Sequence, residues 1–156
     1  MIATISFVAA VRPGEQFEDG RYKSRRRFLD VIVDGTSLWE RLGQRHDKVS
    51  VLCIDFAVQE NAKAIDRLLL KSEADLPNDR RSLFICAECG DLGCGAVTVS
   101  ITRVGETVVW SDFGYENDYE PEISCNDYKD VGPFEFDRDQ YESALLDAVA
   151  QLKSSE

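Results

Sequence analysis

Three cysteines in a glycine-rich segment are the residues of this chain with the clearest chemical potential. Cys86, Cys89 and Cys94 lie in the stretch CAECGDLGCG, residues 86–95. Two thiolates separated by two residues on a turn can bind one tetrahedral metal ion, and the glycines allow the backbone to fold so that the sulfur atoms converge. The pattern resembles half of a zinc knuckle, and Cys94 falls where a third ligand could lie.

A fourth ligand is missing near these cysteines, so three interpretations stay open. Residues 97–99 offer no soft donor, and Cys125 or the only histidine, His46, would have to reach the site through the fold. The first interpretation is a glycine turn whose small buried thiols act as apolar residues. The second is a structural zinc site with Cys86, Cys89 and Cys94 as ligands. The third is a redox or disulfide role, although a valine-rich strand pattern follows where thioredoxin-type activation requires a helix N-terminus.

Catalysis is not predicted from these residues, and the sequence leaves open whether the chain is an enzyme. A thiol nucleophile usually works with an adjacent base, and His46 lies in the polar stretch GQRHDK. A solvated loop histidine is the simpler interpretation of that position. Asp91, within the cysteine segment, is expected to bond its own backbone in a turn.

An acidic segment rich in aromatic residues lies between Glu106 and Glu142. It holds twelve of the carboxylates of the chain against only Lys129 and Arg138, and eight of the fifteen aromatic residues. Rings supply rigid contact area while the carboxylates create a field of one sign, a combination that suits docking to a basic protein. The alternative is a solvated acidic loop with its rings in the core. Calcium is not expected, because the spacing of an EF-hand is absent from the sequence.

We therefore expect a binding protein, in concrete form an immunity or antitoxin protein that neutralises a basic, nuclease-type toxin domain. The expected partner-binding residues are Asp112, Tyr115, Glu116, Asp118, Tyr119, Glu120, Glu122, Asp127, Tyr128 and Asp130. The alternative function is a small zinc-binding or thiol-redox protein that uses the cysteine segment; apart from zinc, no cofactor is expected.

Composition narrows the class of protein. A chain of 156 residues predicts one domain over residues 1–156, and a net charge of −11 argues against nucleic acid and anionic membranes as partners. No apolar run approaches the roughly 20 residues that cross a bilayer, and no positive region precedes the first apolar run, so a cytoplasmic protein with reduced thiols is expected. A cluster of five cations within residues 21–27 is expected to pair with the chain's own carboxylates or to protect a strand edge.

The elements that would position these residues follow from periodicity and capping signals. Strands are expected at residues 2–11, 27–34, 49–56 and 82–85, with a hairpin of 96–102 and 107–110. Helices are expected at 38–42, at 58–72 and after Asp137, where Tyr141, Leu145, Val149 and Leu152 share one face; residues 112–132 read as a loop. The expected fold class is α+β, a mostly antiparallel sheet with about three helices packed on it.

The segment FICAECGDLGCGAVTVSITRVGETVVWSDFGYENDYEP, with GPFEFDRDQY after it, resembles a group of small acidic bacterial proteins of unknown function. The resemblance covers residues 84–141 well and the N-terminal half loosely. Some members of the group are described as oxidoreductases. In this chain Gly90, Gly93 and Gly95 do not precede a predicted helix, so no nucleotide-binding site is expected.

Overall fold

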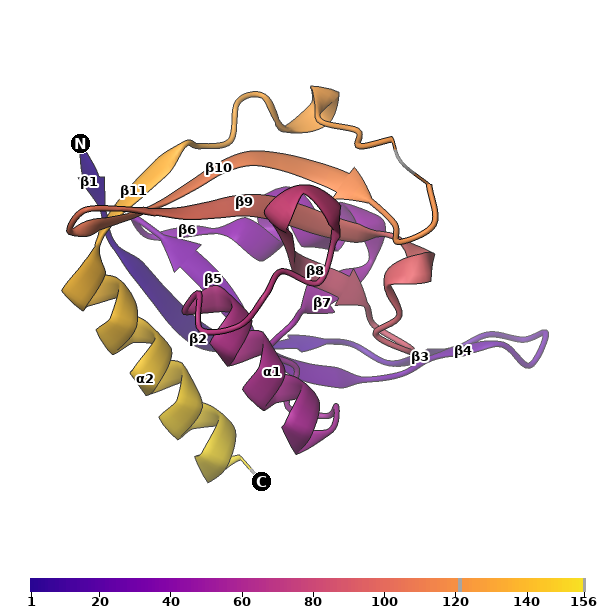
Figure 1. Cartoon of the computed structure of the whole chain (residues 1–156). Coiled ribbons are helices and arrows are strands. Elements are labelled where there is room, and N and C mark those ends of the chain that lie inside the picture. Colours follow the sequence, from indigo (N-terminus) through magenta and orange to yellow (C-terminus); the bar gives the residue numbers. More distant parts are fainter. Residues whose placement is uncertain (121, 156) are drawn as a thin grey trace.

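Two large β-sheets, a small two-stranded sheet and two long helices are present in the described residues, 1–120 and 122–155, of the computed structural model (Figure 1). The larger sheet contains, in spatial order, β1 (Ile2–Ala3), β11 (Phe134–Asp137), β10 (Thr107–Glu116), β9 (Ala96–Val104), β8 (Arg80–Cys86) and β7 (Lys48–Ser50). The smaller sheet contains β2 (Ile5–Arg12), β5 (Arg26–Val33) and β6 (Thr36–Ser37). The helices are α1 (Val58–Leu68) and α2 (Arg138–Ser154). The α+β class is confirmed, but β1 pairs with β11 in parallel, so the larger sheet is mixed, and strands outweigh helices.

The N-terminal hairpin forms as expected, because alternate residues of both strands, Ile5 and Phe7 in β2 and Leu29, Val31 and Val33 in β5, are apolar and enter the main core. The other face of β5 is also partly buried, since Phe28 packs in a second, smaller cluster. Ile5 pairs with Val33 at one end, and Arg12 pairs with Arg26 at the other. Beyond Arg12 the chain continues as a second, narrow hairpin of β3 (Glu15–Gln16) and β4 (Tyr22–Lys23). Figure 1 shows this narrow hairpin extending away from the two sheets.

The expected strand at residues 49–56 is largely wrong. Only β7 joins the larger sheet there, and residues 51–56 connect the two sheets instead. The Val51 amide donates to the Leu83 carbonyl in β8 (3.0 Å), whereas the Leu52 carbonyl accepts from the Leu29 amide in β5 (2.9 Å). This segment is apolar because it is buried between two sheets, and such a run cannot be distinguished from a regular strand by sequence pattern.

The hairpin of β9 and β10 is confirmed, but β10 continues to Glu116, so the loop expected at residues 112–132 begins five residues too early. The register shifts between Ser111 and Gly114, and Asp112 has φ of 55°. A β-bulge of this kind inserts a residue and breaks the two-residue alternation by which a strand is recognised. The bulge therefore hid the second half of the strand from the sequence pattern.

The capping signals at Ser37 and Asp137 each make the bond expected of the first residue of a capping box, whereas the Gln140 side chain bonds the backbone of Ile5 instead of completing its box. The Asp137 carboxylate accepts from the Gln140 amide (3.1 Å) at the start of α2, and the Ser37 hydroxyl accepts from the Glu40 amide (3.0 Å). The segment after Ser37 is a single wide turn, Trp39–Gly43, rather than an α-helix. A side chain at Gly43 would lie 2.9 Å from ring atoms of Phe84, so glycine is required there by packing.

The core is centred on Trp110, which is fully buried in β10. Its ring meets Phe136 and Tyr141 edge to face, with centroids 5.5 and 6.1 Å away. The Trp110 indole donates to the Tyr141 hydroxyl (3.2 Å), which donates to the Leu68 carbonyl at the end of α1 (2.6 Å). One hydroxyl thus joins the larger sheet and both helices. Among the helices described, none combines the length and apolar character required to cross a bilayer.

Replacing Tyr141 by Phe should lower the free energy of unfolding by about 1–3 kcal/mol, because the buried Trp110 indole and Leu68 carbonyl lose their partner. Urea unfolding followed by tryptophan fluorescence measures this change. Tyr119→Phe is the matched control, since that ring is 69% exposed and its loss of a hydroxyl should change stability by less than about 0.5 kcal/mol. Equal effects of the two substitutions would contradict the role of the Tyr141 hydroxyl.

Candidate functional site

The cysteine loop, residues 86–95, brings its three thiols together. Cys86 ends β8, Cys94 ends a short 3₁₀ turn, and β9 begins directly afterwards. The three sulfur atoms all lie within 4.8 Å of one another, and the Cys89 and Cys94 Sγ atoms are 3.6 Å apart. Cys86 is half-buried, whereas Cys89 and Cys94 are exposed, and all three are free thiols. Residues that are eight positions apart in sequence therefore form one compact sulfur site at the end of a hairpin.

Local backbone geometry explains this convergence. The Gly90 amide donates to the Cys86 carbonyl (2.9 Å), and the Asp91 carboxylate accepts from the Gly93 amide (2.9 Å), which confirms the turn role expected for Asp91. Gly95 has φ of +89°, and a side chain there would collide with the Tyr115 hydroxyl. Glycine at this position thus allows both the turn and the close approach of β10.

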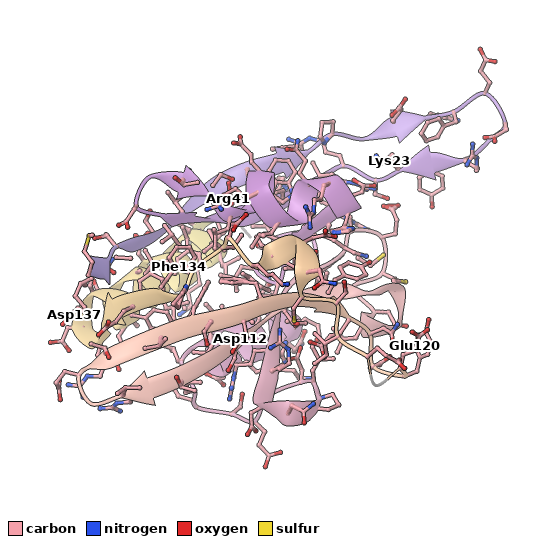
Figure 2. The ribbon with its side chains drawn as sticks, turned by 90° about the horizontal axis from the view of Figure 1, so that it is seen from above. Lys23, Arg41, Asp112, Glu120, Phe134 and Asp137 are labelled. Carbon is pink, nitrogen blue, oxygen red and sulfur yellow. The ribbon has the colours of Figure 1, made fainter. Side chains whose placement is uncertain are left out.

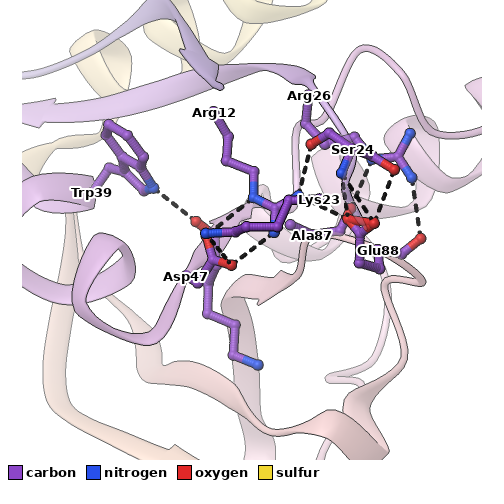
Figure 3. Close-up of polar contacts among 9 residues, drawn as sticks. Arg12, Lys23, Ser24, Arg26, Trp39, Asp47, Ala87 and Glu88 are labelled. Atoms are coloured by element: carbon purple, nitrogen blue, oxygen red, sulfur yellow. Dashed lines mark hydrogen bonds and ion pairs between the residues drawn. The ribbon is translucent and has the colours of Figure 1, made fainter. Parts of the chain in front are cut away.

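A polar clamp, formed by Arg12, Ser24, Arg26, Asp47 and Glu88, holds the loop from outside (Figure 3). The Arg12 guanidinium donates to the Asp47 and Glu88 carboxylates, at 2.7 Å each, and its side chain is only 5% exposed. The Ser24 hydroxyl donates to Glu88 (2.9 Å), and the Arg26 guanidinium donates to the carbonyl of Glu88 (3.1 Å). Because Glu88 lies between Cys86 and Cys89, the clamp ties the base of the narrow hairpin to the thiols.

Most cations of the basic cluster, residues 21–27, pair with carboxylates of the chain itself. Lys23 pairs with Asp47 (3.1 Å), Arg27 pairs with Asp55 (2.6 Å), and Arg21 pairs with Asp19 (2.6 Å). The expected pairing with the chain's own carboxylates is confirmed for these three cations. The hydrogen bond from Arg12 and that from Lys23 hold the pKa of Asp47 below its usual range, although burial opposes the shift.

The thiols influence each other's ionisation. Burial would raise the pKa of Cys86, but hydrogen bonds from the backbone amides of Cys89 and Glu88 and from the two other thiols outweigh it and lower that pKa. The pKa of Cys94 is raised to about 11, because its thiol is hydrogen-bonded to Cys89 and Cys86 and a thiolate at Cys86 repels further negative charge. Cys86 is therefore the thiol of the cluster that ionises most readily, and a bound cation would favour the ionisation of all three.

Neither residue that could have completed the ligand set lies in the sulfur cluster. His46 Nε2 is 2.9 Å from the Tyr128 hydroxyl, and its ring packs on Tyr115 at 4.4 Å between centroids. Cys125 Sγ lies next to Gly114, beside the buried Arg80. Over residues 1–120 and 122–155, the only group of His, Cys, Asp and Glu ligand atoms close enough to hold one ion consists of the three cysteines. The arrangement offers three sulfur ligands, one fewer than a tetrahedral ion takes.

Lys48 and Tyr115 connect the loop to the rest of the larger sheet. The Lys48 ammonium donates to the Cys94 carbonyl (3.0 Å), and the Tyr115 hydroxyl also donates to it (3.4 Å). Sequence reasoning missed Lys48, Arg12 and Glu88 as residues of this site. The position of Glu88 between two cysteines could have indicated its role. Arg12 and Lys48 are distant in sequence and reach the loop only in the folded chain.

The expected partner-binding residues divide into exposed and buried groups. Asp112, Asp118, Tyr119, Glu120, Glu122, Asp127 and Asp130 are exposed, and Tyr115 is half-buried. Tyr128 is only 2% exposed and belongs to the core, and Glu116 is buried in an ion pair with Arg80 (2.8 Å). The expectation that Glu116 and Tyr128 face a partner is therefore corrected: the sheet extension buries the first and the apolar core the second.

The carboxylates of the acidic segment also do not gather on one side. In Figure 2, Glu120 lies at one end of the molecule, Asp137 at the opposite end and Asp112 between them. Two parts of the segment reach the cysteine loop: Tyr115 in β10 contacts the Cys94 carbonyl, and Asp118 in the turn after β10 lies beside Gly93. We call the exposed residues Asp118, Tyr119, Glu120 and Glu122 the acidic lip; of these, Asp118 lies beside the cysteine loop.

Lowering the pH should weaken the polar clamp. Hydrogen bonds from Arg12 and Ser24 overcome burial and lower the pKa of Glu88 below its ordinary 4.5, and the pKa of Asp47 is lowered below 3.8. Because these pKa values are lower in the folded chain, the clamp's contribution is complete above the ordinary values and is lost as the pH falls through the lowered ones. The free energy of unfolding, measured with urea, should fall steeply below roughly pH 4.5 in the native chain and less steeply in Asp47→Asn/Glu88→Gln. Parallel curves for the two proteins would show that the clamp does not contribute.

The sulfur cluster is the part of this surface with the clearest chemical potential, because three soft donor atoms converge there. The acidic lip adds an anionic border with one exposed ring, Tyr119. Comparison of the chain with protein-family models, curated proteins and solved structures gave no match.

Proposed function

We propose that this chain binds a soft metal ion, with zinc as the first candidate, through Cys86, Cys89 and Cys94. The observation that carries the proposal is the convergence of three free thiols within 4.8 Å. Thiolates prefer zinc, monovalent copper and related ions to magnesium or calcium. Two of the thiols are exposed, so an ion can reach them without opening the core.

The spacing of the sulfur atoms fits one bound ion. Zinc–sulfur bonds of about 2.3 Å in a tetrahedron place the sulfur atoms about 3.8 Å apart. The Cys89 and Cys94 Sγ atoms are 3.6 Å apart, and Cys86 Sγ is within 4.8 Å of both. Small side-chain rotations would bring all three to binding distance, and the clamp on Glu88 keeps the intervening backbone in place.

The charge of the site supports a cation as its ligand. The thiols oppose one another's ionisation, as the raised pKa of Cys94 shows, and a bound cation supplies the positive charge that ionises all of them. Metal binding would therefore release protons and should strengthen as the pH rises.

Protein purified without chelator should contain close to one zinc ion per chain, as measured by elemental analysis. Cys86→Ser, Cys89→Ser and Cys94→Ser should each lower zinc affinity at least about tenfold. Saturating zinc, at about 100 times its dissociation constant, should stabilise the native chain by about 2.7 kcal/mol. Cys125→Ser is the matched control and should behave as the native chain, because this thiol lies outside the cluster. Equal zinc content in all four variants would contradict the proposal.

A second candidate function is favoured by the exposed ring of Tyr119. This ring is 69% exposed among the carboxylates of Asp118, Glu120 and Glu122, and an aromatic side chain in such surroundings is typical of a docking surface. We propose that the acidic lip binds a basic protein, in concrete form a nuclease-type toxin domain that the chain would neutralise as an immunity protein. Such a surface would accelerate association by electrostatic attraction, and the gain would decrease with salt.

Co-purification with the basic toxin domain encoded by a neighbouring gene tests this second function. Asp118→Asn/Glu120→Gln should slow association at low salt by about tenfold, because the local field is weakened. Asp139→Asn/Glu142→Gln removes the same number of charges at the opposite end of the molecule and should leave the rate nearly unchanged. Association rates from stopped-flow fluorescence that respond equally to both pairs would point to net charge rather than to the acidic lip. Lack of binding at low salt would remove the candidate.

A further inference from the structure

We propose that the cysteine loop is a receptor for a trivalent metalloid hydroxide, with arsenite as the defining probe. This inference rests on the proposed function, because it uses the same three thiols, and it specifies the class of ion they fit best. A trivalent arsenic centre forms a pyramid with three sulfur atoms, and its lone pair takes the fourth position. It requires three soft ligands and no fourth.

The number of ligands matches this requirement. Three sulfur atoms converge within 4.8 Å, and in the described part of the chain no fourth ligand atom joins them. The imidazole and the further thiol that could have joined them are engaged elsewhere: His46 contacts the Tyr128 hydroxyl at 2.9 Å, and Cys125 packs beside Gly114. Structural zinc sites are usually closed by four protein ligands, whereas a pyramidal metalloid site is complete with the three present.

The charge of the product also favours a trivalent centre. Three thiolates with a divalent ion carry a net charge of −1, and with a monovalent ion −2, whereas a trivalent centre gives a neutral group. The surroundings are already anionic, since Asp91 lies within the loop and Asp118 lies beside Gly93. Glu88 is neutralised by Arg12, and the Lys48 ammonium lies at the Cys94 carbonyl. A neutral product adds no negative charge next to the uncompensated carboxylates.

The binding step balances without an added reactant. Arsenite at neutral pH is the uncharged As(OH)₃, and it condenses with three Cys–SH groups to give As(S–Cys)₃ and three molecules of water. Three As–S bonds form and three As–O bonds break, and each thiol proton leaves with a hydroxide. No atom changes its oxidation state. The exposed Cys89 and Cys94 can react first, and Cys86, half-buried at the end of β8, then closes the pyramid.

The experiment titrates the reduced, metal-free chain with arsenite and, separately, with zinc chloride. Intact-mass spectrometry counts bound arsenic, and a thiol reagent counts the thiols that remain. The expected result is one arsenic per chain with three thiols protected, while Cys53 and Cys125 remain outside the reaction. Cys53 is an internal reference, because burial raises the pKa of its thiol to about 11 and makes it unreactive in the folded chain.

Single variants distinguish three-thiol binding from binding by any pair of thiols. Cys86→Ser, Cys89→Ser and Cys94→Ser should each weaken arsenite binding at least about tenfold, and Cys125→Ser should not. Circular dichroism confirms that each variant is folded. Arsenite affinity that survives any one of the three substitutions would overturn the inference.

The zinc titration separates this inference from the proposed function. Zinc binding without protection of three thiols by arsenite would overturn the inference and leave the proposed function standing. Binding of neither ion would overturn both. Arsenite binding with loss of three free thiols, whether zinc binds or not, would support the inference.

Discussion

The buried guanidinium of Arg12 is the contact on which the cysteine loop most depends. It donates hydrogen bonds to the carboxylates of Asp47 and Glu88 and to the Ser24 carbonyl. This one side chain therefore connects the end of β2, the segment before β7 and the cysteine loop. A buried cation that loses its partners strongly destabilises a fold, so separating these segments would cost considerable free energy. The sulfur atoms converge because the backbone between Cys86 and Cys89 is held from outside as well as by its own turn.

The rest of the fold supplies a stiff base for this contact. Residues 51–56 join the two sheets through hydrogen bonds on both sides, and the Tyr141 hydroxyl joins the larger sheet to both helices. Near the sulfur site, the Arg80–Glu116 pair is sealed inside the bulged part of β10, where Arg80 also donates to the Thr98 hydroxyl (3.0 Å). The acidic lip therefore begins directly after a strand end that is anchored by a buried ion pair.

Sequence patterns predicted most elements and the three cysteines that cluster, but not the surroundings of the cluster. The hairpins and the capped α2 helix follow from local periodicity, and the three cysteines converge because their spacing and glycines act locally. Glu116 and Tyr128 were misplaced, since a bulge concealed the strand that buries one and tertiary packing buries the other. Arg12 and Lys48 could not be found, because nothing in their local sequence records the distant carboxylate or carbonyl that they contact.

The narrow hairpin of β3 and β4 has a mechanical consequence for the loop it borders. Its outer turn, near Gly20, stands away from the sheets, whereas its base includes Ser24, which grips Glu88 through backbone and side chain (Figures 1 and 3). The base of this hairpin therefore contacts the residue that lies between Cys86 and Cys89 in sequence. A partner that moved the hairpin would pull on the backbone of the cysteine loop through Glu88, even if it bound only at the outer turn.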